Sequence, residues 1–201
     1  MADIEIPERE KLTIDLVKAN IYALIGIIPI VILYVVPFYL VWKDQLTLTH
    51  VRSIILETEW LKSRAISFLI IISLIIIGII LHELIHGITW SFYTKNGFKS
   101  IKFGVLIKML TPYCHCKEPL KVNQYILGAI MPAIILGVIP ALLAILFGSI
   151  GLLAFGIFFT IAAMGDFLII FLLRKENRNT LVLDHPTEPG CFIYRKKENY
   201  L

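Results

Sequence analysis

Two histidines and a glutamate lie within five residues of one another in an otherwise apolar stretch. His82, Glu83 and His86 form the pattern H-E-x-x-H in the segment ILHELIHGITW. On a helix, residues four apart lie on one face, one turn above each other, so both imidazoles could bind one metal ion. Zinc accepts histidine nitrogens and, at catalytic sites, keeps one position for water, which Glu83 would reach as a general base. The spacing therefore predicts a zinc metalloendopeptidase of the HExxH type, with Zn²⁺ as its cofactor.

The alternative is that these are ordinary polar residues of a helix, because the motif also arises by accident. Their apolar setting favours the metal. A charge near the centre of a lipid bilayer costs about 2.5–3.5 kcal/mol even on the lenient insertion scale. Three ionisable side chains in one apolar span need compensation, and a bound zinc ion provides it.

Asp166 is the candidate for a third metal ligand. Within the long apolar runs, Glu83 and Asp166 are the only acidic residues. Asp166 lies eight positions before the basic Arg174. His86 lies nine positions before Lys95. If both helices run in the same direction, both groups lie roughly 12–14 Å from the charged boundary, at 1.5 Å per residue. The alternative is a lone buried carboxyl group in its protonated form.

Long charge-free runs explain the composition, in which 58% of residues are apolar and the mean hydropathy is +0.81. A soluble domain is roughly 45–50% apolar, and a membrane-spanning helix needs about twenty apolar residues. We predict an all-α membrane protein, one membrane-embedded domain over residues 1–201. Its four transmembrane helices are expected at 20–42, 66–93, 122–147 and 150–173. The charged segment 1–19 does not resemble a signal peptide and is predicted to be a short polar segment, with a helix as one option.

The segment 95–121 differs from its neighbours because it is basic and partly alternating. Ile101, Phe103 and Val105 fall on one side of a period-two pattern, with Lys102 on the other. This pattern predicts a short β-hairpin or strand in the loop between the second and third spans. The segment 174–201 is predicted to be a polar tail.

Basic residues predict the orientation of the chain. The segments before the first span, between the second and third spans, and after the fourth span together contain fifteen Lys and Arg residues, against four on the other side. The positive-inside rule then places both termini in the cytoplasm of a bacterial or archaeal cell. Membrane orientation explains these charges, so no nucleic-acid binding is expected from the net charge of +4.

Three further features lie near the expected site. Cys114, His115 and Cys116 are consecutive, and neighbouring strand residues point to opposite faces, so the three cannot easily bind one ion. We expect a strand near the site there, with a contribution of His115 to catalysis or zinc binding as the alternative. Gly128 and Pro132 interrupt the third span, either opening its backbone toward the site or, as we favour, allowing close helix packing.

The chain resembles a family of zincin-type membrane peptidases first described as a domain of unknown function. The resemblance rests on ILHELIHG in one span, GAIMPAIILGVIP in the next, GD in the fourth, and DHPTEPGCFIY in the tail, roughly from Ser67 to Tyr194. That family in turn resembles the site-2 protease class of intramembrane metalloproteases, in which the aspartate usually precedes the glycine; here Gly165 precedes Asp166. The resemblance implies zinc held by three side chains and Glu83 as the base. It also implies an extended substrate paired with the 101–118 region.

Two classes of function follow. The first is a membrane-embedded metallopeptidase that cleaves membrane-associated protein or peptide substrates within the lipid bilayer. The second is a metal-binding transporter or sensor without hydrolysis, which would not need Glu83 and would usually show internal repeats and ionisable groups on several spans. A zinc-stabilised scaffold is a third, weaker interpretation. The oligomeric state stays open at this stage.

Overall fold

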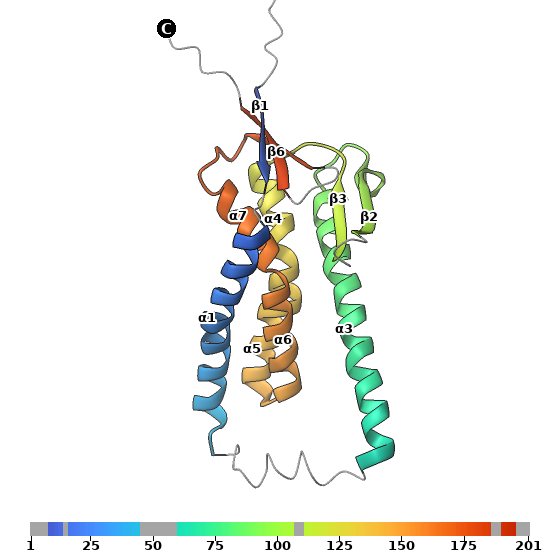
Figure 1. Cartoon of the computed structure of the whole chain (residues 1–201), viewed down its shortest axis with the longest axis vertical. Helices are drawn as coiled ribbons and strands as arrows, with labels where there is room; N and C mark the ends of the chain where they lie inside the picture. The colour runs from blue at the N-terminus through green and yellow to red at the C-terminus, as the bar shows by residue number, and fades with distance from the viewer. Residues whose placement is uncertain (1–7, 14–15, 45–59, 107–110, 186–189, 196–201) are drawn as a thin grey trace, which may run out of the picture.

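Long helices make up most of the molecule, and small antiparallel sheets lie at one end of them (Figure 1). The computed structural model describes residues 8–13, 16–44, 60–106, 111–185 and 190–195. In chain order the elements are β1 (Glu8–Thr13), α1 (Leu16–Trp42), α3 (Trp60–Ser91), the 3-10 turn η1 (Gly97–Ser100), β2 (Ile101–Leu106), β3 (Thr111–Cys116), β4 (Leu120–Lys121), α4 (Val122–Pro132), the π-helical turn η2 (Ala133–Val138), α5 (Ile139–Phe147), α6 (Ile150–Ala162), α7 (Met164–Leu173), β5 (Leu181–Asp184) and β6 (Gly190–Arg195).

Among the residues that the structure describes, three helical runs are long and apolar enough to cross a membrane, and a bent pair of helices, α6 and α7, could make a fourth. The three runs cover Leu24–Trp42 in α1, Ile66–Ser91 in α3, and Val122–Phe147 in the continuous α4–η2–α5 run. Only 11% of the most apolar stretch of α1 is buried inside the molecule, and the same share holds for α3. Isoleucine and leucine side chains therefore line the outside of these helices, whereas a helix of a soluble protein would turn them toward the core.

The structure differs from the predicted helix boundaries in three places. Helix α1 begins at Leu16 and helix α3 at Trp60, earlier than expected, while residues 45–59 between them lie outside the described part of the chain. The single helix predicted over 150–173 is a pair, α6 and α7, bent by 45°. Apolar composition cannot reveal such a bend, because both halves are equally apolar.

Glycines set how closely the helices approach one another. A Cβ atom added to Gly156 of α6 would lie 2.7 Å from the carbonyl oxygen of Gly137 in η2. A Cβ atom on Gly78 of α3 would lie 2.1 Å from the Phe159 ring of α6. These positions need glycine because only a residue without a side chain allows such close contact. Glycine therefore serves helix packing here, as we favoured for the third span.

The loop between α3 and α4 contains the antiparallel β2–β3 pair, as the alternating pattern predicts. Ile101 pairs with Cys116 at one end and Leu106 with Thr111 at the other. The pair packs on α3 at Gly87, where an added Cβ atom would lie 2.6 Å from the Phe103 ring. This contact places β2 and β3 beside the helix that contains the H-E-x-x-H motif.

A four-stranded antiparallel sheet corrects the all-α prediction. Its strand order is β1-β6-β5-β4, so it joins the predicted polar segment 1–19, the loop 95–121 and the tail 174–201. Residues 8–13 of the first segment form a strand, not a helix. On the sheet, Val182 and Ile193 are fully buried and pack with Leu173 of α7. The sheet escaped prediction because its strands are short and their partners lie far away in the sequence.

Candidate metal centre

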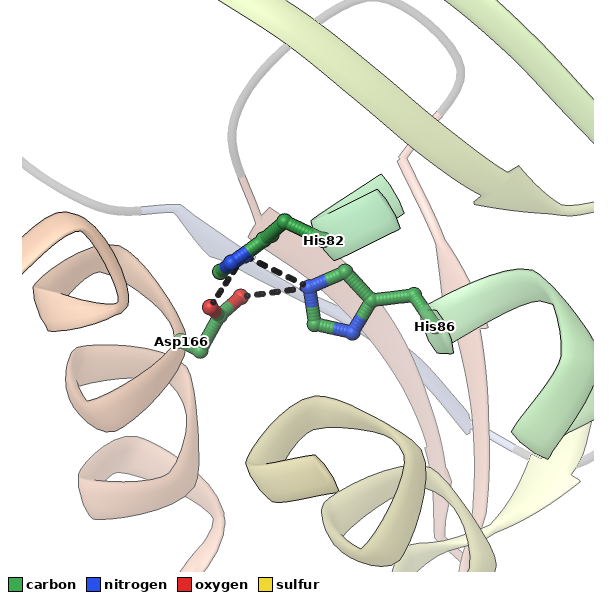
Figure 2. Close-up of side chains that lie close together, drawn as sticks. All are labelled: His82, His86 and Asp166. Atoms are coloured by element: carbon green, nitrogen blue, oxygen red, sulfur yellow. Dashed lines mark hydrogen bonds and ion pairs between the residues drawn. The ribbon is translucent and has the colours of Figure 1, made fainter. Parts of the chain in front are cut away.

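Three side chains from two helices converge at one point (Figure 2). His82 and His86 extend from successive turns of α3, and Asp166 extends from the first turn of α7. The Nε2 atoms of the two histidines are 3.2 Å apart. Asp166 Oδ2 lies 3.2 Å from His82 Nε2, and Asp166 Oδ1 lies 3.3 Å from His86 Nε2. Within the described part of the chain, no other group of three His, Cys, Asp or Glu side chains converges in this way.

The separations between these atoms fit a tetrahedral zinc ion. Zinc binds histidine nitrogen at about 2.0–2.1 Å, and two ligands at that distance on a tetrahedron are about 3.3–3.4 Å apart. The Nε2 atoms of the two histidines are 3.2 Å apart, close to this value, and each lies 3.2–3.3 Å from a different oxygen of the Asp166 carboxylate. Two histidines and one carboxylate also match the donor set of catalytic zinc sites, which leave the fourth position to water.

The backbone of α4 fixes the orientation of the His86 ring. His86 Nδ1 donates a hydrogen bond to the carbonyl oxygen of Gly128 at 2.8 Å. In the neutral ring this leaves the lone pair on Nε2, which points at the other two side chains, and such a bond is typical of histidines that bind metal. Trp90, one turn beyond His86, stacks on its ring with centroids 5.1 Å apart. His82 differs, because its Nδ1 is buried and has no hydrogen-bond partner among the described residues.

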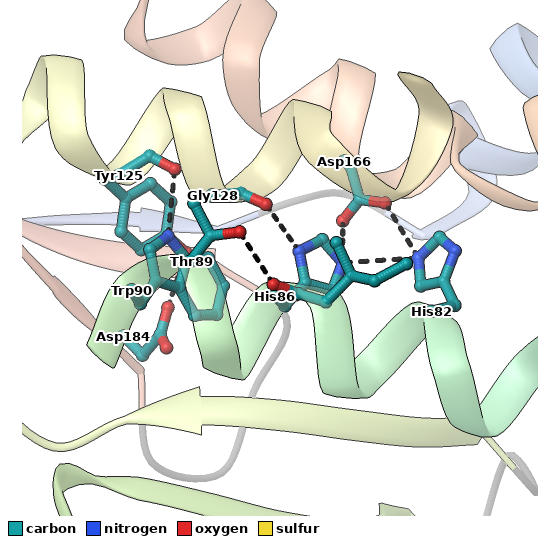
Figure 3. Close-up of polar contacts among 9 residues, drawn as sticks. His82, His86, Thr89, Trp90, Tyr125, Gly128, Asp166 and Asp184 are labelled. Carbon is teal, nitrogen blue, oxygen red and sulfur yellow. Dashed lines mark hydrogen bonds and ion pairs between the residues drawn. The ribbon is translucent and has the colours of Figure 1, made fainter. Parts of the chain in front are cut away.

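Trp90 occupies the space that a side chain at position 128 would need. A Cβ atom on Gly128 would lie 2.0 Å from the indole Nε1 of Trp90. The same indole N–H donates to the carbonyl oxygen of Tyr125 at 3.1 Å. Helices α3 and α4 therefore lie close enough together for a main-chain carbonyl of one to reach a histidine of the other (Figure 3).

Glu83 does not join the three converging side chains. It lines a groove of about 460 Å³ between α3 and the β2–β3 pair, together with apolar residues. The other lining residues are Ile79, Ile80, Leu84, Phe103, Gly104, Val105, Pro112 and Tyr113. The main-chain N–H of Cys114 in β3 points toward the Glu83 carboxylate. Glu83 thus lies next to the convergent group in sequence and faces a space that a ligand could occupy.

The remaining predicted residues lie around this centre but not in it. His115 Nδ1 is 3.8 Å from Asp184 Oδ2, and His115 is not among the three converging side chains. Pro132 is buried one turn beyond Gly128. Burial raises the pKa of Cys116 to about 11 and that of Cys191 to about 12, so neither thiol is ionised near neutral pH.

Sequence reasoning missed Trp90, Tyr125 and Asp184. Trp90 continues the four-residue spacing of His82 and His86, so its position on their helix face could have been noticed. Tyr125 has no such signal. Asp184 lies in the predicted polar tail, and nothing local in LDHPTEP indicates the distant partners that it contacts.

Comparison with curated proteins and with solved structures gives no match. A family model does match, over residues 75–181, and its description is "Putative zincin peptidase". The matched region contains His82, Glu83, His86 and Asp166, and it ends before Asp184. Because the match covers more than half of the chain and includes all three converging side chains, this protein belongs to the family of putative zincin peptidases.

Proposed function

We propose that this protein is a membrane-embedded zinc metallopeptidase that cleaves membrane-associated protein or peptide substrates. The observation that carries the proposal is the convergence of His82, His86 and Asp166 at the separations of a tetrahedral zinc site. Membership of a zincin family supports the same chemistry. The three long apolar helices, largely unburied, support a position in the lipid bilayer.

In this proposal the three side chains hold the metal, and Glu83 handles the proton. Zinc supplies Lewis-acid activation of a water molecule and of the scissile carbonyl group. Glu83 takes a proton from the attacking water and passes it to the leaving amine, as a general base and then a general acid. The hydrogen bond from His86 to the Gly128 carbonyl keeps the ring in the tautomer that offers Nε2.

The groove beside Glu83 supports a peptide substrate. Its lining is apolar apart from Glu83, which suits the side chains of a membrane-associated segment. One edge of strand β3 faces α3. The N–H of Cys114 points from this edge toward Glu83. The N–H of Cys116, two residues further along the strand, lies on the same edge. An extended substrate lying in this groove would run beside the proposed base.

The transport alternative lacks these supports. A transporter or sensor has no need of a carboxylate that stands apart from the three ligands and lines a groove beside a strand edge. Glu83 occupies that position here, and its presence favours hydrolysis over metal movement.

The decisive variant is Glu83→Gln, which keeps the size of the side chain and removes the base. We expect full zinc content and a loss of peptide hydrolysis of about 10²–10⁴-fold, the usual contribution of a positioned base. The assay uses purified protein in detergent micelles with a pool of apolar single-span peptides, and mass spectrometry detects the products. Glu176→Gln, which changes a half-buried carboxylate outside the site, is the matched control. Unchanged cleavage in Glu83→Gln, together with metal uptake into vesicles that Asp166→Asn abolishes, would establish transport instead.

A further inference from the structure

Asp184 is a buried carboxylate in β5 that no proposed chemical step uses. It lies outside the region matched by the family model, and its residue is only 8% exposed. Burial raises the pKa of Asp184, while its hydrogen bonds from Tyr125 and Cys116 oppose that effect. Burying a carboxyl group costs free energy, so we asked which contacts Asp184 makes possible at this position.

One oxygen of Asp184 connects to the helix beside the metal centre. The Tyr125 hydroxyl of α4 donates to Asp184 Oδ1. The Tyr125 ring stacks on Trp90 with centroids 5.1 Å apart, and Trp90 stacks in turn on the metal-centre residue His86. Figure 3 shows Tyr125, Trp90 and Asp184 together on one side of His86. Tyr125 is therefore connected through two ring contacts to a proposed zinc ligand.

The other oxygen of Asp184 connects to the strand beside the proposed base. The main-chain N–H of Cys116 in β3 donates to Asp184 Oδ2 at 2.7 Å. Two residues earlier on the same edge, the N–H of Cys114 points toward the Glu83 carboxylate. The bond to Asp184 therefore fixes β3 close to the point where its edge meets the base.

We propose that Asp184 is a positioning residue that joins α4 to β3 and so holds both against the site end of α3. The inference rests on the proposed function and adds a residue from the tail to the same site. Without Asp184, no side chain would connect α4 to β3 at this point. The Gly128 carbonyl of α4 and the Cys114 N–H of β3 would then be held less firmly against α3. Partners of metal ligands that lie one shell further out commonly change metal affinity or activity by about 10–100-fold.

Three variants test the bridge by metal binding, without any substrate. Asp184→Ala removes both acceptors, and we expect zinc affinity to fall about tenfold and the visible absorption spectrum of the Co²⁺-loaded protein to change. Asp184→Asn keeps one acceptor for the Cys116 N–H and offers a donor to the Tyr125 oxygen, so it should restore most of the affinity. Tyr125→Phe removes only the α4 connection and keeps the stacked ring. Its loss should not add to that of Asp184→Ala, since both break the same path.

A control in the same sheet separates positioning from general stability. Glu176→Gln breaks the ion pair of Glu176 with Arg195 of β6 at 2.7 Å and should leave zinc affinity and the Co²⁺ spectrum unchanged. Melting curves of the metal-free proteins report any loss of stability separately. If Asp184→Ala binds zinc as the Glu176→Gln control does, or if Asp184→Asn fails to restore binding, the positioning role is wrong. If wild-type protein binds zinc with these variant effects but cleaves no peptide, the proposed function fails and the role of Asp184 stands. Wild-type protein that binds no zinc overturns both.

Discussion

The direction in which His86 points is decided by a backbone carbonyl and an aromatic ring, and both depend on Gly128. A methyl group there would collide with the indole of Trp90, a rigid ring that cannot fold away. We predict that Gly128→Ala displaces Trp90 from His86 and lowers zinc affinity about 10–100-fold, as measured by competition with a chelator. Gly165→Ala is the matched control: it lies next to Asp166, and an added Cβ atom there meets nothing within 4 Å. Equal zinc affinity in the two variants would contradict this account of His86.

Asp166 contributes the only negative charge among the three converging side chains. Replacing it with asparagine keeps the shape but leaves the charge of a bound zinc ion less compensated in a low-dielectric setting. Asp166→Asn should therefore lower zinc affinity, whereas Glu83→Gln should not. Metal analysis of both purified variants after dialysis gives the comparison. A loss of zinc in Glu83→Gln but not in Asp166→Asn would mean that the glutamate is the third ligand.

At the scale of single residues, the sequence predicted the site residues whose positions follow from local spacing. The histidines were found because four residues separate them on a helix, and Asp166 because few acidic residues lie in apolar runs. The structure brings these three together. Trp90, Tyr125 and Asp184 were missed, since their roles arise from contacts between segments that are far apart in the sequence.

Among the elements, the crossing of η2 and α6 determines where α7 begins and so where Asp166 lies. Gly156 and Gly137 meet there backbone to backbone. We predict that Gly156→Ala forces the two helices apart and lowers the free energy of unfolding by about 1–3 kcal/mol, the usual cost of overpacking. Gly151→Ala in the same helix meets only Ser149 Oγ at 4.0 Å and should be tolerated. Thermal unfolding in one detergent compares the two, and equal stability would refute the close crossing.

The turn that leads from α3 into β2 depends on one half-buried carboxylate. Glu118 accepts hydrogen bonds from the Ser100 hydroxyl and from the main-chain N–H of Lys95 and of Asn96, and these lower its pKa to about 2. Because its pKa is lowered, the ionised Glu118 carboxylate stabilises the folded state at pH values above 4.5, its ordinary pKa. This stabilisation is lost as the pH falls toward 2. We predict that the protection of the Lys95 amide from hydrogen exchange decreases in this range. Glu118→Gln should remove the pH dependence; its persistence would assign the effect to another group.

Elements were predictable where one segment carries its own signal. Charge-free length indicated the helices, and alternation indicated the β2–β3 pair. Strand β5 has only the four residues Leu181–Asp184, and β1 has the charged sequence EREKLT, so neither has a local pattern strong enough to indicate a sheet. Their pairing with β6 stabilises them, and that pairing joins Glu8 to Arg195.

For the whole molecule, the four-stranded sheet joins segments that lie far apart in the sequence and would keep them on one side of a membrane. It brings together β1, β4, β5 and β6, which belong to the three basic segments that the charge count assigns to one side. We predict that a cysteine introduced at Asn177 reacts only with reagents that reach the cytoplasm, and one at Asp44 only with reagents applied outside. Both positions are exposed, and the labelling uses a background without the native cysteines. Labelling of the Asn177→Cys variant from outside intact cells would reverse the orientation.

The pairing of β1 with β6 also has a consequence for biosynthesis. Ribosomes add roughly 5–20 residues per second, so β1 waits on the order of ten seconds for the strand that pairs with it. During that interval the growing chain contains His82 and His86 before it contains Asp166, and Asp166 before Asp184. A zinc ion captured early would be held by two histidines alone and would exchange readily. The proposed zinc site would therefore be complete only after α7 has been synthesised, and its connection to Asp184 only after β5 has followed.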